Sequence, residues 1–192
     1  HLRNRRQRQM CIRDRADTLK QELSVLLAPQ RGLVLCALIS AALLGGALLF
    51  EHVGGMAPCS LCIWQRWAHV AVIVCALGWL VISQPIGASL RAGLIITALA
   101  GITSVGVAGY HAGVEWQLWA GPAGCTASLS SGGSTADLVD SLLATPVVRC
   151  DDVPWSLFGL SMAGWNMLLS VDIVALAMMS FIFGDRNRTR TS

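Results

Sequence analysis

Charged residues are scarce in this sequence. Asp, Glu, Lys and Arg make up 13% of the 192 residues, whereas 54% are hydrophobic. Soluble domains carry about 25% charged residues, so this composition excludes an ordinary soluble domain and indicates a membrane protein. Long polar stretches are also missing between most of the hydrophobic runs, which leaves no room for a separate soluble domain.

Four hydrophobic runs account for this composition, at residues 33–50, 63–82, 94–110 and 162–183. Each is close to the roughly 20 residues that a helix needs to cross the hydrocarbon core. Short connections between successive helices favour antiparallel neighbours. The sequence therefore predicts an all-α membrane protein, a four-transmembrane-helix bundle with two outer loops, of which the second is long.

Basic residues are nearly absent from one side of this bundle. Twelve of the fourteen lie before the first run, between the second and third, or after the fourth, and the exceptions are Arg66 and Arg149. Because basic loops stay in the cytoplasm, both termini are expected there, with the cysteine-bearing loops on the opposite, oxidising side. The expected division is a basic N-terminal segment (1–31), a membrane domain (32–184) and a basic tail (185–192). The first 15 or so residues show no apolar periodicity and are interpreted as appended sequence, outside the fold.

The main chemical motif is Cys59-Ser60-Leu61-Cys62, where a short loop meets the second run. Two cysteines at this spacing can form a small disulfide ring, and the free amides of a first helical turn favour a thiolate. Arg66 follows Cys62 by four residues and His69 by seven, so a helix places all three on one stripe. Haem attachment is excluded because Ile63, not His, follows the second cysteine.

A second pair of cysteines, Cys125 and Cys150, lies in the long loop before the fourth run. Between them, leucines and aspartates separate onto two sides of residues 136–144, which predicts a short helix on the membrane surface. Cys36 and Cys75 lie inside hydrophobic runs and are interpreted as small packing residues. Asp172 lies inside the fourth run, where a charge is costly, and is expected to face the bundle or to be protonated.

The motifs together resemble the disulfide bond formation protein B (DsbB) family. The resemblance covers about residues 32–183 and is carried by P-C-S-L-C-I-W-Q-R at 58–66 and C-D-D-V-P-W-S-L-F-G-L at 150–160, with weaker support from G-P-A-G-C at 121–125. It implies an enzyme of the bacterial inner membrane that reoxidises a periplasmic DsbA-like thiol oxidase and passes the electrons to ubiquinone or menaquinone. The relay that this family forms keeps the bacterial periplasm oxidising.

The resemblance also implies roles for individual residues. Cys125 would be attacked by the reduced partner, Cys150 would be its disulfide mate, and Cys59 would accept Cys150. Cys62 would then be released as the thiolate that faces the quinone, beside Arg66. His111 and His69 are further candidates for quinone contact, although interfacial hydrogen bonding explains them equally well. Trp155 and Phe158 are candidates for lining the quinone pocket, although an aromatic belt explains both equally well.

Other interpretations remain open at this stage. A zinc site or purely structural disulfides could also use the four loop cysteines, but reactive thiols need the cationic setting found here, and no metal is expected. A quinone reductase like vitamin K epoxide reductase also uses a four-helix bundle. A non-catalytic membrane scaffold with two disulfides is the third alternative. Residue spacing alone leaves all three pairings of four cysteines possible.

Overall fold

The computed structural model describes residues 25–122 and 149–184, together with five isolated positions nearer the N-terminus. Within these residues four helices are long and apolar enough to cross a membrane. They are α2 (Pro29–His52), α3 (Ser60–Ile86), α4 (Leu90–Glu115) and α6 (Met162–Phe183). The four predicted spans are thereby confirmed.

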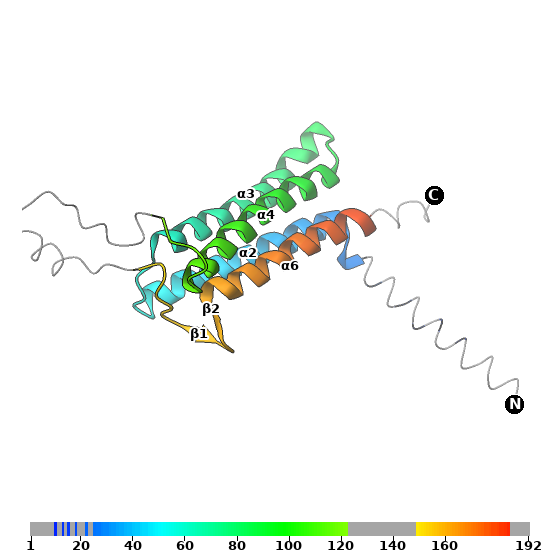
Figure 1. Ribbon diagram of the computed structural model, residues 1–192. Helices are drawn as coiled ribbons and strands as arrows, with labels where there is room; N and C mark the ends of the chain where they lie inside the picture. The colour runs from blue at the N-terminus through cyan, green and yellow to red at the C-terminus, as the bar shows by residue number, and fades with distance from the viewer. Residues whose placement is uncertain are drawn as a thin grey trace, which may run out of the picture.

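The helices run alternately up and down in one bundle (Figure 1). The start of α2 and the end of α6 lie at one end of the bundle, and the α2–α3 connection lies at the other, which we call the cysteine end. The two-stranded hairpin that precedes α6 also lies at the cysteine end.

The helices begin where the sequence supplies caps. Pro29 occupies the first turn of α2, where its missing N–H costs nothing. The side chains of Ser89 and Ser161 accept backbone N–H groups at the starts of α4 and α6, and the sulfur of Cys59 does the same for α3. The first cysteine of the Cys59–Cys62 pair is therefore also a helix cap.

Helix α3 continues through Pro85 to Ile86, and it ends at Gly87, whose φ of 63° lies in the left-handed region that glycine adopts freely. The backbone N–H groups of Gly87 and Ala88 both bond the Ser83 carbonyl and close the last turn. Pro85 lies in that turn and lacks an N–H, so one helical hydrogen bond is missing there, yet the helix continues to Ile86.

Helix α4 lies at the centre of the bundle and packs most extensively against α6 and α3. Its small residues allow this close packing: Gly101 lies against Val174, and Ser104 and Ser170 are joined by a buried hydrogen bond of 3.0 Å. Cys36 is fully buried and its thiol lies 3.7 Å from the Ile173 carbonyl, which confirms its packing role, whereas Cys75 is only half-buried.

A short antiparallel hairpin, β1 (Ser156–Leu157) and β2 (Leu160–Ser161), was not predicted. Its two-residue turn, Phe158 and Gly159, has positive φ at both positions, as the twist of a tight hairpin requires. Ser161 ends the hairpin and caps α6. The hairpin thus fixes where α6 begins.

Two further expectations have different outcomes. Asp172 is exposed on α6, so the first alternative, that it faces the bundle, is wrong, and the second, that it is protonated, stays a prediction. Ser170 and Ile173 lie on the packed face of α6. The predicted surface helix at 136–144 lies outside the described residues.

Candidate active site

The cysteine pair forms the first turn of α3. Cys59 and Cys62 are both free thiols with their sulfurs 2.9 Å apart, and the backbone N–H of Cys62 donates to the Cys59 sulfur at 3.2 Å. Each sulfur therefore lies where a small displacement would join it to the other. This arrangement suits a pair that alternates between dithiol and disulfide.

Cys59 is the more deeply buried of the two. It is 5% exposed and belongs to an apolar cluster with Leu61, Val114 and Cys150. The hydrogen bond to Cys62 and burial raise the pKa of the Cys59 thiol above its usual range. Cys59 therefore remains a thiol at neutral pH, while Cys62 is only partly buried.

Cys150, at the C-terminal end of the long loop, belongs to the same cluster. It is 1% exposed and disulfide-bonded, and its sulfur lies 3.6 Å from the hydroxyl oxygen of Ser60. The structure thus brings Cys150 next to the first helical turn that carries Cys59 and Cys62. Cys125 lies outside the described residues.

The chain around Cys150 is held by an ion pair. Arg149 donates to both carboxylate oxygens of Asp151, at 3.0 and 2.5 Å. This hydrogen bonding holds the pKa of Asp151 below its usual range. Asp151 therefore compensates the positive charge of Arg149, one of the two basic residues outside the expected cytoplasmic side.

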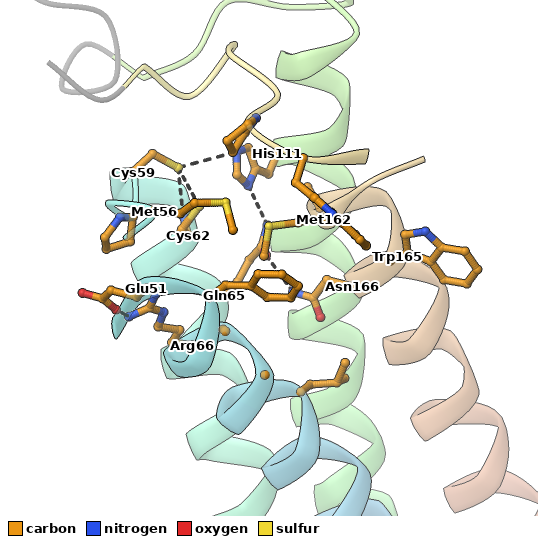
Figure 2. Close-up of a pocket in the computed structure, with 18 of the residues that line it drawn as sticks. Glu51, Met56, Cys59, Cys62, Gln65, Arg66, His111, Met162, Trp165 and Asn166 are labelled. Atoms are coloured by element: carbon orange, nitrogen blue, oxygen red, sulfur yellow. Dashed lines mark hydrogen bonds and ion pairs between the residues drawn. The ribbon is translucent and has the colours of Figure 1, made fainter. Parts of the chain in front are cut away.

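Arg66 lies on the same stripe of α3 as Cys62 and His69, as the helical period predicts, and all three line one cavity. Its guanidinium forms an ion pair with Glu51 at the end of α2 (Figure 2). The predicted cation on the stripe with Cys62 is therefore present, but its charge is partly neutralised by Glu51, a partner that the sequence did not reveal.

A continuous set of hydrogen bonds joins the sulfurs to the helices behind them, as the dashed lines in Figure 2 show in part. His111 Nε2 lies 3.6 Å from the Cys59 sulfur, and His111 Nδ1 lies 2.8 Å from Gln65 Nε2. Asn166 then donates to Gln65 Oε1 at 2.7 Å and accepts from His69 Nε2 at 2.7 Å. We call this set the polar chain, and its members are Cys62, Cys59, His111, Gln65, Asn166 and His69.

Glu115 fastens the polar chain to the start of α6. Its carboxylate accepts a hydrogen bond from the Ser161 hydroxyl, and its other oxygen lies 3.8 Å from His111 Nε2. The Glu115 side chain is only 3% exposed. The final turn of α4, which the sequence reasoning ended at residue 110, therefore contributes two ionisable groups to the site.

The cavity beside the cysteines has a volume of about 440 Å³. Apolar residues of α2 form one wall, Trp165 and Met162 of α6 form another, and Cys59, Cys62 and Arg66 close the cysteine end. Trp155 lines it too and packs against Phe50 with ring centroids 5.4 Å apart. Phe158 is 88% exposed at the hairpin turn and does not line the cavity, so its suggested contact there is wrong.

Comparison with known proteins identifies what this arrangement belongs to. The family model "Disulfide bond formation protein DsbB" matches residues 29–180, which is most of the chain. The chain belongs to the DsbB family. Its site is therefore that of a multi-pass membrane thiol–disulfide oxidoreductase.

Individual DsbB proteins are similar over most of their length. Disulfide bond formation protein B 1 of Pseudomonas fluorescens is 33% identical over 172 residues, covering 84% of this chain and 93% of the relative. Disulfide bond formation protein B of Verminephrobacter eiseniae is 32% identical, covering 73% and 78%. That of Methylococcus capsulatus is 30% identical, covering 78% and 92%. Membership of this family favours the redox interpretation over the scaffold and epoxide reductase alternatives.

The same DsbB site has the donors of a metal centre. The sulfurs of Cys59 and Cys62 and a ring nitrogen of His111 all lie within 4.8 Å of one another. Two thiolates and an imidazole are ligands that zinc accepts. The expectation that no metal is bound stays a prediction.

Sequence reasoning found the DsbB residues that share a motif and missed those that meet only in space. Cys59, Cys62, Arg66, His69, His111 and Trp155 were candidates, and all line the cavity. Gln65, Asn166, Glu115 and Glu51 were not. Gln65 and Asn166 are polar residues inside apolar helices, and that was the one signal that could have marked them.

Proposed function

We propose that this DsbB-family chain takes electrons from a reduced DsbA-like thiol oxidase and passes them through its four loop cysteines to a membrane quinone. The observation that carries the proposal is the position of Cys59 and Cys62. The pair forms part of the wall of an apolar cavity on one side, and Cys59 packs with the buried Cys150 on the other.

The exposure of the cysteines supports the order of transfer. Cys150 is 1% exposed, so a folded soluble protein has no access to its sulfur. We assign the attacked sulfur to Cys125 and the internal one to Cys150. The Cys150 thiolate then attacks the Cys59 sulfur of the oxidised pair, an S–S bond forms between them, and Cys62 leaves as a thiolate with the two electrons of the broken bond.

The donors around the cavity fit a quinone. Apolar walls accept a ring and its lipid tail, and Arg66, His69 and His111 offer polar atoms along the cavity. We assign these residues, with Trp155, to quinone contact. A bound quinone supplies an acceptor for two electrons and two protons. The protein side of this chemistry is the placement of the Cys62 sulfur on the cavity and the exclusion of water around Cys59.

The placement in the cell follows from the charge distribution. We propose that the chain lies in the bacterial inner membrane with both termini cytoplasmic and the cysteine end periplasmic. The start of α2 and the end of α6 share one end of the bundle, which is consistent with this arrangement.

The test is turnover by the purified protein. Given reduced DsbA-like protein and a short-chain ubiquinone, the protein should oxidise one thiol pair for each quinone reduced. Cys62→Ser should abolish quinone reduction, and Cys75→Ser, a matched change further along α3, should not. Equal rates in these two variants would contradict the assignment.

A further inference from the structure

The hydrogen bonds of the polar chain all point the same way. Asn166 Nδ2 donates to Gln65 Oε1, which leaves Asn166 Oδ1 to accept from His69 Nε2 and, at 3.5 Å, from the Ser170 hydroxyl. Because Gln65 Oε1 is already the acceptor from Asn166, the Gln65 amide presents its NH2 group to His111 Nδ1. Each side-chain amide thus accepts on one side and donates on the other.

This orientation fixes the tautomer of His111. A ring nitrogen that accepts from Gln65 carries no proton, so neutral His111 carries its proton on Nε2. That N–H faces the Cys59 sulfur at 3.6 Å and the Glu115 carboxylate at 3.8 Å, and the backbone of Cys150 also accepts a hydrogen bond from the ring.

The chain continues through the sulfurs. The Cys59 thiol donates to the Cys62 sulfur at 2.9 Å, so Cys62 is the final acceptor. At the other end, His69 Nδ1 is buried and makes no hydrogen bond. Hydrogen bonds that follow one another in a single direction strengthen each other in a low-dielectric interior. The electron-rich end of this series is the Cys62 sulfur.

We propose that Gln65 and Asn166 are positioning residues that hold His111 in its Nε2–H tautomer, so that the negative charge of the reduced pair resides on Cys62. Because His111 Nε2 already carries a proton in this tautomer, it cannot accept the Cys59 proton, and the Cys59 thiol stays directed at the Cys62 sulfur. This inference rests on the proposed function for its purpose, because the favoured sulfur is the one assigned to face the quinone. Its geometry does not depend on that function.

The direct test is nitrogen NMR of the reduced protein, labelled with 15N-histidine and held in nanodiscs. The signals of His111 are assigned by their loss in His111→Asn. The wild-type protein should show a neutral His111 protonated on Nε2. Gln65→Glu replaces the donating NH2 group by a carboxylate that only accepts, so His111 should change to the Nδ1–H tautomer.

A second variant acts from another helix. Asn166→Asp turns the group facing Gln65 into an acceptor, which reverses the Gln65 amide and should change the His111 tautomer in the same way. Gln84→Glu is the matched control, because it makes the same substitution at an exposed position of α3. This control should leave the tautomer unchanged.

A chemical readout accompanies the spectrum. The ratio of alkylation rates, Cys62 over Cys59, should fall about tenfold in Gln65→Glu and in Asn166→Asp, and stay constant in Gln84→Glu. A wild-type His111 protonated on Nδ1 would overturn the proposal, even if neither variant folds. So would an unchanged tautomer and ratio in a folded Gln65→Glu protein. Neither readout uses a quinone, so failure of the proposed function would be seen separately, as absence of turnover.

Discussion

Cys59 and Cys62 are three residues apart and yet have different surroundings. Cys59 caps the helix, is buried, and has its pKa raised by its hydrogen bond to Cys62 and by burial. Cys62 lines the cavity, and its sulfur accepts a hydrogen bond from the Cys59 thiol. The pair is therefore built as one proton-holding sulfur and one electron-rich sulfur.

This difference predicts a pH dependence. Because a raised pKa keeps the thiol form to higher pH, Cys59 should react with iodoacetamide much more slowly than Cys62 from about pH 6 to about pH 9. Peptide mass spectrometry of the reduced protein after timed alkylation measures both rates. Equal labelling of the two cysteines at neutral pH would show that the asymmetry is absent.

The ion pair between Arg66 and Glu51 gives two variants with opposite effects. Glu51→Gln leaves the positive charge of Arg66 uncompensated beside Cys62, so alkylation of Cys62 should become several-fold faster. Arg66→Met leaves the carboxylate instead and should slow it by a similar factor. Arg66→Lys, which keeps the charge without the planar fork, should lie between Arg66→Met and wild type. Changes of the same sign in Glu51→Gln and Arg66→Met would refute this electrostatic account.

At the residue scale, the sequence predicted only the relations between side chains that lie on the same helix. The stripe of Cys62, Arg66 and His69 follows from the helical period, because all three residues belong to α3. The partners Glu51, His111 and Asn166 belong to α2, α4 and α6. No spacing along the chain encodes which helices become neighbours, so these contacts needed the structure.

The helices themselves owe their arrangement to small residues. A Cβ atom at Gly101 would lie 2.9 Å from a methyl group of Val174, whereas one at Gly106 would have no neighbouring atom within 4 Å. Glycine at position 101 thus permits the close approach of α4 and α6 that brings His111 and Asn166 to the same cavity.

This difference makes a matched pair of substitutions. Gly101→Val should destabilise the protein by about 1–3 kcal/mol relative to Gly106→Val, because both make the same change in helix propensity and only the first overpacks the interface. Unfolding in mixed detergent, followed by circular dichroism, measures the difference. Equal stability of the two variants would mean that α4 and α6 are not closely packed at this point.

Helix ends were predicted less well than helix positions. Hydropathy located each span but ended α4 at residue 110, five residues early, because the last turn carries His111 and Glu115. Those two polar residues form hydrogen bonds with Gln65 of α3 and with Ser161, the N-cap of α6. The part of α4 that hydropathy did not predict therefore lies at the active site.

For the whole molecule, the composition predicted a four-helix membrane bundle and the structure confirms it. The relation between the two cysteine pairs is a matter of tertiary structure. Because Cys150 is buried beside Cys59, we expect the partner protein to attack Cys125 and not Cys150.

This arrangement predicts which complex can be trapped. Cys150→Ser removes the internal sulfur, so a reduced DsbA-like partner should remain covalently attached through Cys125 when it is mixed with the protein. Non-reducing gels and peptide mapping identify the bond. A complex mapped to Cys59 or Cys62 would reverse the proposed order of transfer.

The central claim is that the Cys59–Cys62 pair delivers electrons directly into the adjoining cavity. The most direct measurement is an anaerobic titration of the fully reduced Cys125→Ser, Cys150→Ser double variant with a short-chain ubiquinone, without any partner protein. The account predicts that one equivalent of quinone is reduced per chain as Cys59 and Cys62 form their disulfide, and that none is reduced when Cys62→Ser is added. Reduction of no quinone by a folded double variant, or undiminished reduction without Cys62, would contradict it.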